Sequence, residues 1–295
     1  MIIEKLKKAN LIHPPKWMDS ASVAYLTITG SQAYAVNTDS SDLDLIGFCM
    51  PPREIVFPHS VGIIPEFGKQ AVKFNVWQQH HVKSEDGKTE YDFTVHNIVT
   101  YFDLCMKMNP NMVDTLFTAE NCVTLRTPIS DLVRENRKLF LSLAGWDKFK
   151  GYSFAQMKKI EGGANQSNPK RAEQTAKFGY DVKFGYHVVR LMLEIEQIML
   201  EGDLDLQKHR EQLKAIRRGE WTLDYLKQWR ADKEAELEKV YTRSTLRQVP
   251  AEDEIRTLLL TCLEEHYGSL STIIQKDIRM DALLAEMRQV MSKYG

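Results

Sequence analysis

The stretch Val23-Ala24-Tyr25-Leu26-Thr27-Ile28-Thr29-Gly30-Ser31 is followed in the chain by Ser41-Asp42-Leu43-Asp44-Leu45-Ile46-Gly47. The first stretch predicts a buried strand over 22–29 that ends in a small-residue turn, and the second predicts a strand over 42–50. Because side chains of a strand alternate between its two faces, Asp42 and Asp44 share a face, with Cα atoms about 6.6 Å apart. Two carboxylates so placed are typical of a divalent-metal site.

The small-residue turn suits the substrate of such a metal. Magnesium usually takes one or two protein carboxylates, and substrate phosphate oxygens complete its octahedron. Gly30 carries no Cβ to hold a phosphate away from the backbone, and the Ser31 hydroxyl is a donor to anionic oxygens. A calcium loop is excluded, since Ile46 and Arg53 stand at its fifth and twelfth positions, where oxygen ligands are needed. A solvated turn is the remaining alternative.

The fuller pattern is Gly30-Ser31-x-x-Tyr34 followed by Thr38-x-x-Ser41-Asp42-x-Asp44-x-x-Gly47. It resembles the signature of nucleotidyltransferases of the DNA polymerase β superfamily, and most of all their RNA-ligase-associated branch from phages and bacteria. The segment Asn109-Pro110-Asn111, with Leu116-Phe117 after it, is similar to the same branch.

Hydrophobic periodicity divides the chain near residue 125. Before it we expect a hairpin of strands over 72–77 and 89–95 around an Asp86-Gly87 turn, then a helix over 97–108 that ends before Pro110. After it, helical patterns cover 211–218, 223–241, 250–267 and 278–294, and a Gly- and Asn-rich loop covers 161–169. We predict an α+β (mixed α/β) fold. Residues 1–125 form a nucleotidyltransferase catalytic domain with a small mixed β-sheet flanked by helices, and residues 126–295 form an all-helical domain that completes the cleft.

Nucleotidyl transfer with two metal ions usually adds a third carboxylate, which holds the second ion and accepts a proton. Asp92 is the best candidate, because it stands mid-strand between Tyr91 and Phe93, where a solvated acid is out of place. Glu90 points to the same face and is the fallback. The alternative is that Asp92 is an edge-strand acid that blunts aggregation.

A polar helix face bears Lys183, His187, Arg190 and Glu194 at helical spacing. The resemblance extends to it, since the branch has a Lys-x-x-x-His-x-x-Arg-Leu helix in its second domain. It implies that Lys183 and His187 reach the triphosphate and that Arg190 bonds phosphate or braces the site. The alternative is a solvated face, on which Glu194 simply pairs with Arg190.

His80 and His81 also invite a zinc interpretation. We expect their side chains to point to opposite faces of a strand, and no Cys or His cluster lies near them in the sequence. The sequence therefore argues against zinc.

Composition sets wider limits. Of 295 residues, 43% are hydrophobic and the net charge is −1, which argues against a protein coated in positive charge. Residues 126–190 nevertheless hold 13 Lys and Arg against 6 Asp and Glu, a basic sector for phosphates. Four scattered cysteines indicate reduced thiols, and no signal peptide or membrane span is recognised. We expect a cytoplasmic protein, in the host cytoplasm if phage-encoded.

Together these features predict a metal-dependent nucleotidyltransferase that moves NMP from an NTP, with ATP expected, to a hydroxyl. Asp42, Asp44 and Asp92 would bind two Mg²⁺ or Mn²⁺ ions, and Gly30, Ser31, Lys183, His187 and Arg190 would bind the nucleotide. RNA or tRNA is one expected acceptor, and a small molecule or a protein hydroxyl is another. The competing hypothesis is a catalytically silent nucleotide-sensing or RNA-binding scaffold.

Overall fold

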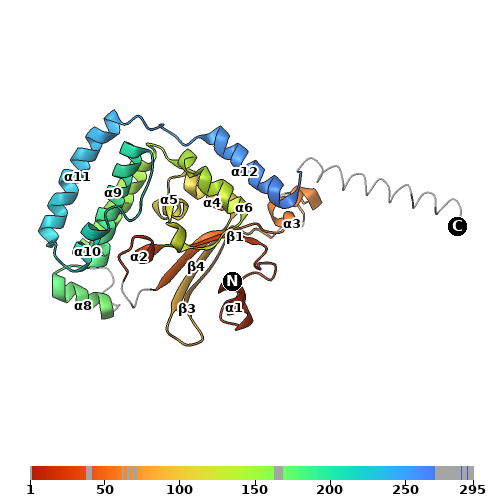
Figure 1. The fold of residues 1–295 in the computed structure, drawn as a ribbon, viewed down its shortest axis with the longest axis horizontal. Coiled ribbons are helices and arrows are strands. Elements are labelled where there is room, and N and C mark those ends of the chain that lie inside the picture. Colours follow the sequence, from red (N-terminus) through yellow and green to blue (C-terminus); the bar gives the residue numbers. More distant parts are fainter. Residues whose placement is uncertain are drawn as a thin grey trace.

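A mixed five-stranded sheet lies in the N-terminal half of the chain, and helices make up the C-terminal half (Figure 1). The computed structural model describes residues 2–37, 42–61, 63–64, 67–68, 72–162, 169–269, 287 and 291. The strands are β1 (Val23–Ile28), β2 (Leu43–Cys49), β3 (Val76–Lys83), β4 (Glu90–Asn97) and β5 (Val123–Leu125). They are ordered β3-β4-β2-β1-β5; β2 and β4 run parallel and the other neighbours antiparallel. The predicted α+β fold is confirmed.

Most helices of the described residues lie on one side of this sheet, and α1 packs on the other (Figure 1). They are α1 (Ile2–Lys8), α2 (Gly30–Ala33), α3 (Arg53–Val56), α4 (Ile98–Met106), α5 (Pro110–Phe117), α6 (Pro128–Glu135), α7 (Gly145–Glu161), α8 (Pro169–Phe178), α9 (Val182–Glu201), α10 (Arg210–Arg217), α11 (Leu223–Arg243) and α12 (Glu252–Tyr267). Three short 3-10 helices add η1 (Pro58–Val61), η2 (Glu120–Cys122) and η3 (Arg137–Phe140). The centre of the predicted loop, at 163–168, lies outside the described residues, as does the predicted helix at 278–294 apart from residues 287 and 291.

The two faces of the sheet pack against different partners. On one face, Leu26, Leu45 and Phe93 form a core with the apolar side of α1. On the other, Tyr25 and Phe48 join the larger core, to which the helices after residue 97 contribute. Because side chains alternate along a strand, the residues just before Leu45 and Phe93 face the helical half. The acids predicted for catalysis occupy those positions.

The larger core contains residues from both sides of Arg126. In Figure 1, α12 returns from the helical half to lie beside α4 and α6, close to the sheet. The Tyr267 hydroxyl donates a hydrogen bond to the Pro51 carbonyl there. Because this core does not separate the two predicted domains, the domain boundary at residue 126 stays a prediction.

The hairpin differs from its prediction at one strand. Its turn is where expected, since the Gly87 N–H bonds to the Ser84 carbonyl at 2.9 Å and Gly87 has a φ of +69°. The first strand, however, is β3 at Val76–Lys83, and the predicted strand over 72–77 is wrong except at its last two residues. Only Trp77 and Val82 of β3 are buried. Because most of its other side chains are exposed and polar, β3 lacks the regular hydrophobic alternation from which a strand is predicted.

Gly47 holds β2 against β1. A Cβ on Gly47 would lie 1.9 Å from the backbone oxygen of Tyr25, an atom that cannot move away without bending β1. We expect Gly47→Ala to lower the free energy of unfolding by about 3 kcal/mol, the upper range for overpacking. Gly151 of α7 is the matched control, since a Cβ there meets nothing within 4 Å. Gly151→Ala should stabilise by roughly 0.5–1 kcal/mol, and urea unfolding of both variants measures the contrast.

In the part of the chain that the structure describes, no helix has the length and apolar character to cross a membrane.

Candidate active site

The glycine of the Gly30-Ser31 turn makes room for an acid. Gly30 has a φ of +63°, and a Cβ on it would lie 2.2 Å from Asp44 Oδ2. The backbone N–H of Thr29 donates to the Asp44 carbonyl at 2.7 Å, which fastens the turn to the start of β2. The carboxylate of Asp44 can therefore lie against the turn only because residue 30 is a glycine.

Asp44 also lies beside the predicted third carboxylate. In the parallel ladder of β2 and β4, Asp44 pairs with Asp92 and Leu43 pairs with Tyr91. Asp42, just before β2, and Glu90, the first residue of β4, precede these pairs. Neighbouring strands are about 4.8 Å apart, so four acids gather at the adjoining strand ends on one face of the sheet.

The acids influence one another electrostatically. The pKa of Asp44 is raised above its usual value, first by burial, then by the negative charges of Asp92 and Asp42. Lys183 and His80 act on the pKa of Asp44 in the opposite direction and lower it. Carboxylates arranged in this way are stabilised by a cation among them.

These acids border a cavity of about 230 Å³ between the sheet and the helices. Its lining residues are Thr29, Gly30, Tyr34, Asp44, Ile46, His80, Asp92, Thr94, Asn111, His187 and Arg190. Five of the predicted site residues thus share one cavity. The other three, Ser31, Asp42 and Lys183, are not among the residues that line it.

Helix α9 brings His187 and Arg190 to the wall of this cavity. Its N-cap is Asp181, whose carboxylate accepts a hydrogen bond from the Lys183 N–H at 2.9 Å and so fixes where the helix begins. His187 then lies one turn further along, half-buried on the cavity wall. Lys183 is exposed and acts on Asp44 through its charge. The spacing predicted from the sequence does place these groups on the side facing the acids.

Arg190 is held in a buried network. Its Nη1 donates to the Tyr34 hydroxyl, to Asp114 Oδ2 and, at 3.1 Å, to Glu194 Oε1. One guanidinium cannot balance two buried carboxylates, and burial raises the pKa of Glu194 well above its usual value. The pairing of Arg190 with Glu194 is confirmed, and these contacts favour the bracing role left open for Arg190.

One residue of this network was missed in the sequence, and another was assigned no role. Asp114 was not singled out, although a lone acid within the apolar helix α5 was a signal, and it is 1% exposed. Tyr34 was noted in the motif, but its function was not assigned. The structure shows that it joins the Gly30-Ser31 turn to Asp114 and Arg190.

The prediction that His80 and His81 point to opposite faces is wrong. Gln79 pairs with Phe93 and Val82 with Tyr91, so the two histidines together oppose Asp92 in a β-bulge. His81 has a φ of +57°, and its backbone N–H donates to Asp92 Oδ1 at 2.7 Å. His80 Nδ1 lies 3.6 Å from the same oxygen. A bulge interrupts strand alternation, which the expectation had assumed.

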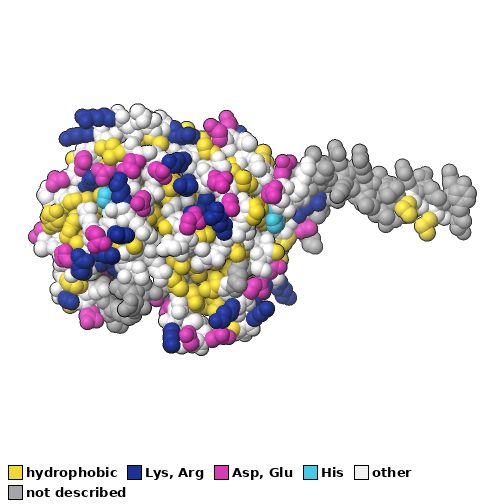
Figure 2. Space-filling view, viewed as in Figure 1, with side chains coloured by type: hydrophobic (Ala, Val, Ile, Leu, Met, Phe, Trp, Pro, Cys, Tyr) yellow, Lys and Arg dark blue, Asp and Glu magenta, His cyan; other side chains and the backbone are white. Residues whose placement is uncertain are grey.

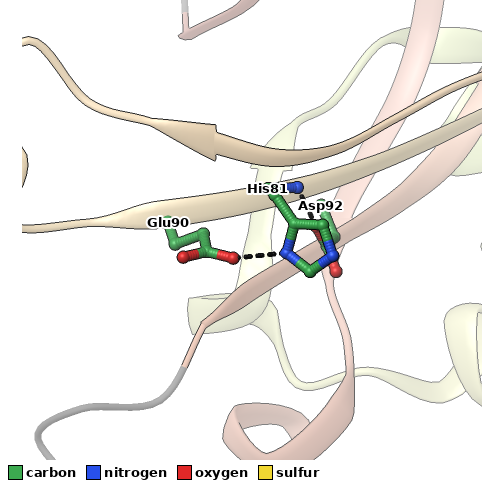
Figure 3. Close-up of side chains that lie close together, drawn as sticks. All are labelled: His81, Glu90 and Asp92. Atoms are coloured by element: carbon green, nitrogen blue, oxygen red, sulfur yellow. Dashed lines mark hydrogen bonds and ion pairs between the residues drawn. The ribbon is translucent and has the colours of Figure 1, made fainter. Parts of the chain in front are cut away.

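The bulge creates a cluster that the sequence did not predict. His81 Nδ1 is 2.6 Å from Glu90 Oε1, and Figure 3 shows the imidazole between Glu90 and Asp92. One ligand atom from each of these three residues lies within 4.8 Å of the others. From the sequence we inferred that no cluster of ligands lies near these histidines. The geometry corrects this inference, because His81 lies in a cluster with Glu90 and Asp92.

Gly30 offers a test of the turn's function. We expect Gly30→Ala to lower activity about 10²-fold, because a displaced Asp44 carboxylate misplaces the reacting groups by about 1 Å. Gly87→Ala is the matched control, since Gly87 has nearly the same φ (+69°) and a Cβ there meets nothing within 4 Å. Steady-state rates decide the matter: similar activity in the two alanine variants would contradict the contact with Asp44.

Comparison with known proteins identifies a family for most of the chain. The family model RlaP, described as the RNA repair pathway DNA polymerase beta family, matches residues 4–261. No curated protein and no solved structure matches the chain.

Proposed function

Because the chain belongs to the RNA repair pathway DNA polymerase beta family, we propose that it transfers NMP from an NTP to a hydroxyl of an RNA end and releases pyrophosphate. The family supports a nucleotidyltransferase in RNA repair. The single observation that carries the finer proposal is the in-register pair Asp44 and Asp92 beside Gly30, on the wall of one cavity.

The residues present fit divalent metal ions. Asp42, Asp44 and Asp92 supply the hard oxygen ligands that Mg²⁺ and Mn²⁺ prefer, and the space at Gly30 leaves the Asp44 carboxylate uncovered by a side chain. We assign two ions, Mg²⁺ or Mn²⁺, to these three acids. When bound, such ions lower the pKa of the acceptor hydroxyl and neutralise charge on the phosphates.

Asp92 is proposed as the proton acceptor rather than Glu90. Asp92 lines the cavity and lies opposite Asp44, whereas Glu90 lies two residues away and bonds to His81. In the reaction, the hydroxyl oxygen forms a bond to the α-phosphorus of the NTP as its proton passes to Asp92. The bond from that phosphorus to the β-phosphate oxygen breaks, and pyrophosphate leaves.

The triphosphate is assigned to the turn and to α9. Backbone N–H groups at Gly30 and Ser31 and the Ser31 hydroxyl would donate hydrogen bonds to the β and γ phosphates, with Lys183 and His187 facing them from the helix. Arg190 is assigned to bracing, since it is 4% exposed and its guanidinium already bonds to two carboxylates. ATP is the expected NTP.

The acceptor proposal rests on the family and on charge. The basic surplus of residues 126–190 includes the start of α9, which lines the cavity at His187 and Arg190. Figure 2 shows acidic and basic side chains interspersed on the face it draws, without a continuous basic stripe. This distribution suits an acceptor end confined to the cavity better than a long nucleic acid bound along the surface.

The test is pyrophosphate release from each of the four NTPs with Mg²⁺ or Mn²⁺, with and without total RNA. The control is the double variant Asp42→Ala plus Asp44→Ala. Release that requires metal, RNA and both carboxylates is expected. Metal-dependent thermal stabilisation with no pyrophosphate from any mixture would favour the silent scaffold instead.

A further inference from the structure

The β-bulge adds an imidazole to the carboxylates of β4, a donor that the proposed reaction does not use. We call His81, Glu90 and Asp92 the bulge site; one ligand atom of each lies within 4.8 Å of the others (Figure 3). We propose that the bulge site binds a divalent transition-metal ion of the Mn²⁺, Co²⁺ or Zn²⁺ class, in addition to the two ions assigned to Asp42, Asp44 and Asp92, with Asp92 shared.

The donor set decides the class of ion. Mg²⁺ takes oxygen ligands and keeps several waters, so an imidazole nitrogen adds little to its binding. Zinc, cobalt and the other transition metals accept imidazole together with carboxylate oxygens. One nitrogen and two carboxylates therefore favour a transition-metal ion, and they leave coordination positions open to water or to a phosphate.

The backbone of the bulge holds the histidine in place. With two residues opposite one, β3 turns His81 toward the face that bears the acids, and the His81 N–H bond to Asp92 Oδ1 fixes that carboxylate. Hydrogen bonds of this kind orient metal ligands and raise affinity. An ion bound here would replace the His81–Glu90 hydrogen bond with bonds from both residues to the ion.

The bulge site is open to solvent on one side. The His81 side chain is 82% exposed, whereas Glu90 and Asp92 are 29% and 26% exposed. An ion can therefore enter from solvent without movement of α9. The surrounding charge favours a cation, since Asp42 and Asp44 lie on the adjoining strand next to these acids.

The experiment measures Zn²⁺ affinity of the full chain without NTP, by competition with a chromophoric chelator. His81→Asn removes the imidazole while asparagine tolerates the left-handed backbone at this position. His80→Asn is the matched control, a neighbouring histidine outside the three ligands. We expect His81→Asn to weaken Zn²⁺ binding at least ~10-fold, and His80→Asn and Asp44→Asn to retain the His81-dependent binding.

Histidine ring resonances give a second readout. The His81 signals, identified by their loss in His81→Asn, should shift and saturate with Zn²⁺ but not with Mg²⁺. Equal Zn²⁺ affinity in wild type and His81→Asn, an equal loss in His80→Asn, or unshifted His81 signals would each overturn the proposal.

Ion binding at the bulge site requires neither NTP nor acceptor, so this inference does not rest on the proposed function. Zn²⁺ binding that depends on His81, in a protein without turnover, would uphold the bulge site and count against the transferase. Turnover without His81-dependent Zn²⁺ binding would support the transferase and count against the bulge site.

Discussion

Replacing Asp44 with asparagine is expected to lower turnover at least ~10³-fold, equivalent to about 4 kcal/mol of lost transition-state stabilisation. Asp44 touches several parts of the proposed site: it lies against Gly30, pairs with Asp92 on the neighbouring strand, and is influenced by the charge of Lys183. Asparagine keeps the shape of the side chain but removes the charge that would hold the metal ions.

The same variant should fold as well as the wild type. Burial and the neighbouring acids raise the pKa of Asp44, so its ionised form is unfavourable in the folded protein without metal. Its removal should leave the unfolding midpoint at neutral pH unchanged or higher. Asp103→Asn, which changes an exposed acid paired with Lys107, is the control for charge. Wild-type turnover in Asp44→Asn would contradict the assignment of this residue.

Replacing Arg190 with methionine is expected to lower the free energy of unfolding by about 3–5 kcal/mol at neutral pH, the usual cost of removing one partner from a buried ion pair. Arg190 carries the positive charge of a network whose acids, Asp114 and Glu194, are 1% and 3% exposed. Without the arginine these acids must bury an uncompensated charge or take up protons. The Tyr34 hydroxyl also loses its donor.

The loss should diminish as the pH falls. Burial raises the pKa values of Asp114 and Glu194, so protonation makes both acids neutral in the folded variant as the pH approaches those raised values. Removing the arginine then matters less. Arg218→Met is the control, since the Arg218–Glu220 pair is exposed and solvent screening leaves it little effect on stability. Urea unfolding at several pH values measures both variants, and a small, pH-independent loss for Arg190→Met would contradict the network.

The sequence was sufficient to predict the elements that depend on local patterns, together with the acidic and basic residues that they carry. The strand bearing Asp44, the turn at Gly30, and the basic face of α9 all follow from short patterns whose meaning does not depend on distant residues. The family was also identified correctly from the Gly30-Ser31 and Asp42-x-Asp44 motifs. That Asp92 pairs with Asp44 could be expected only by analogy, because the register of parallel strands is set by non-local packing.

The bulge in β3 illustrates what the sequence does not contain. Gln79-His80-His81-Val82 is compatible with a regular strand, and nothing in it marks the extra residue. The bulge becomes apparent only when β3 pairs with β4, since two residues then oppose Asp92. Asp114 is a different case, because an acid inside an apolar helix could have been recognised as needing a buried partner.

The most direct test of the central claim follows the α-phosphate. An NTP labelled at that position is incubated with Mg²⁺ or Mn²⁺ and RNA, and the label in RNA is compared with the pyrophosphate released. We expect equal amounts of both, and neither product in the Asp42→Ala plus Asp44→Ala variant. Label that stays in free nucleotide with all tested acceptors, with no pyrophosphate formed, would contradict nucleotidyl transfer by this site.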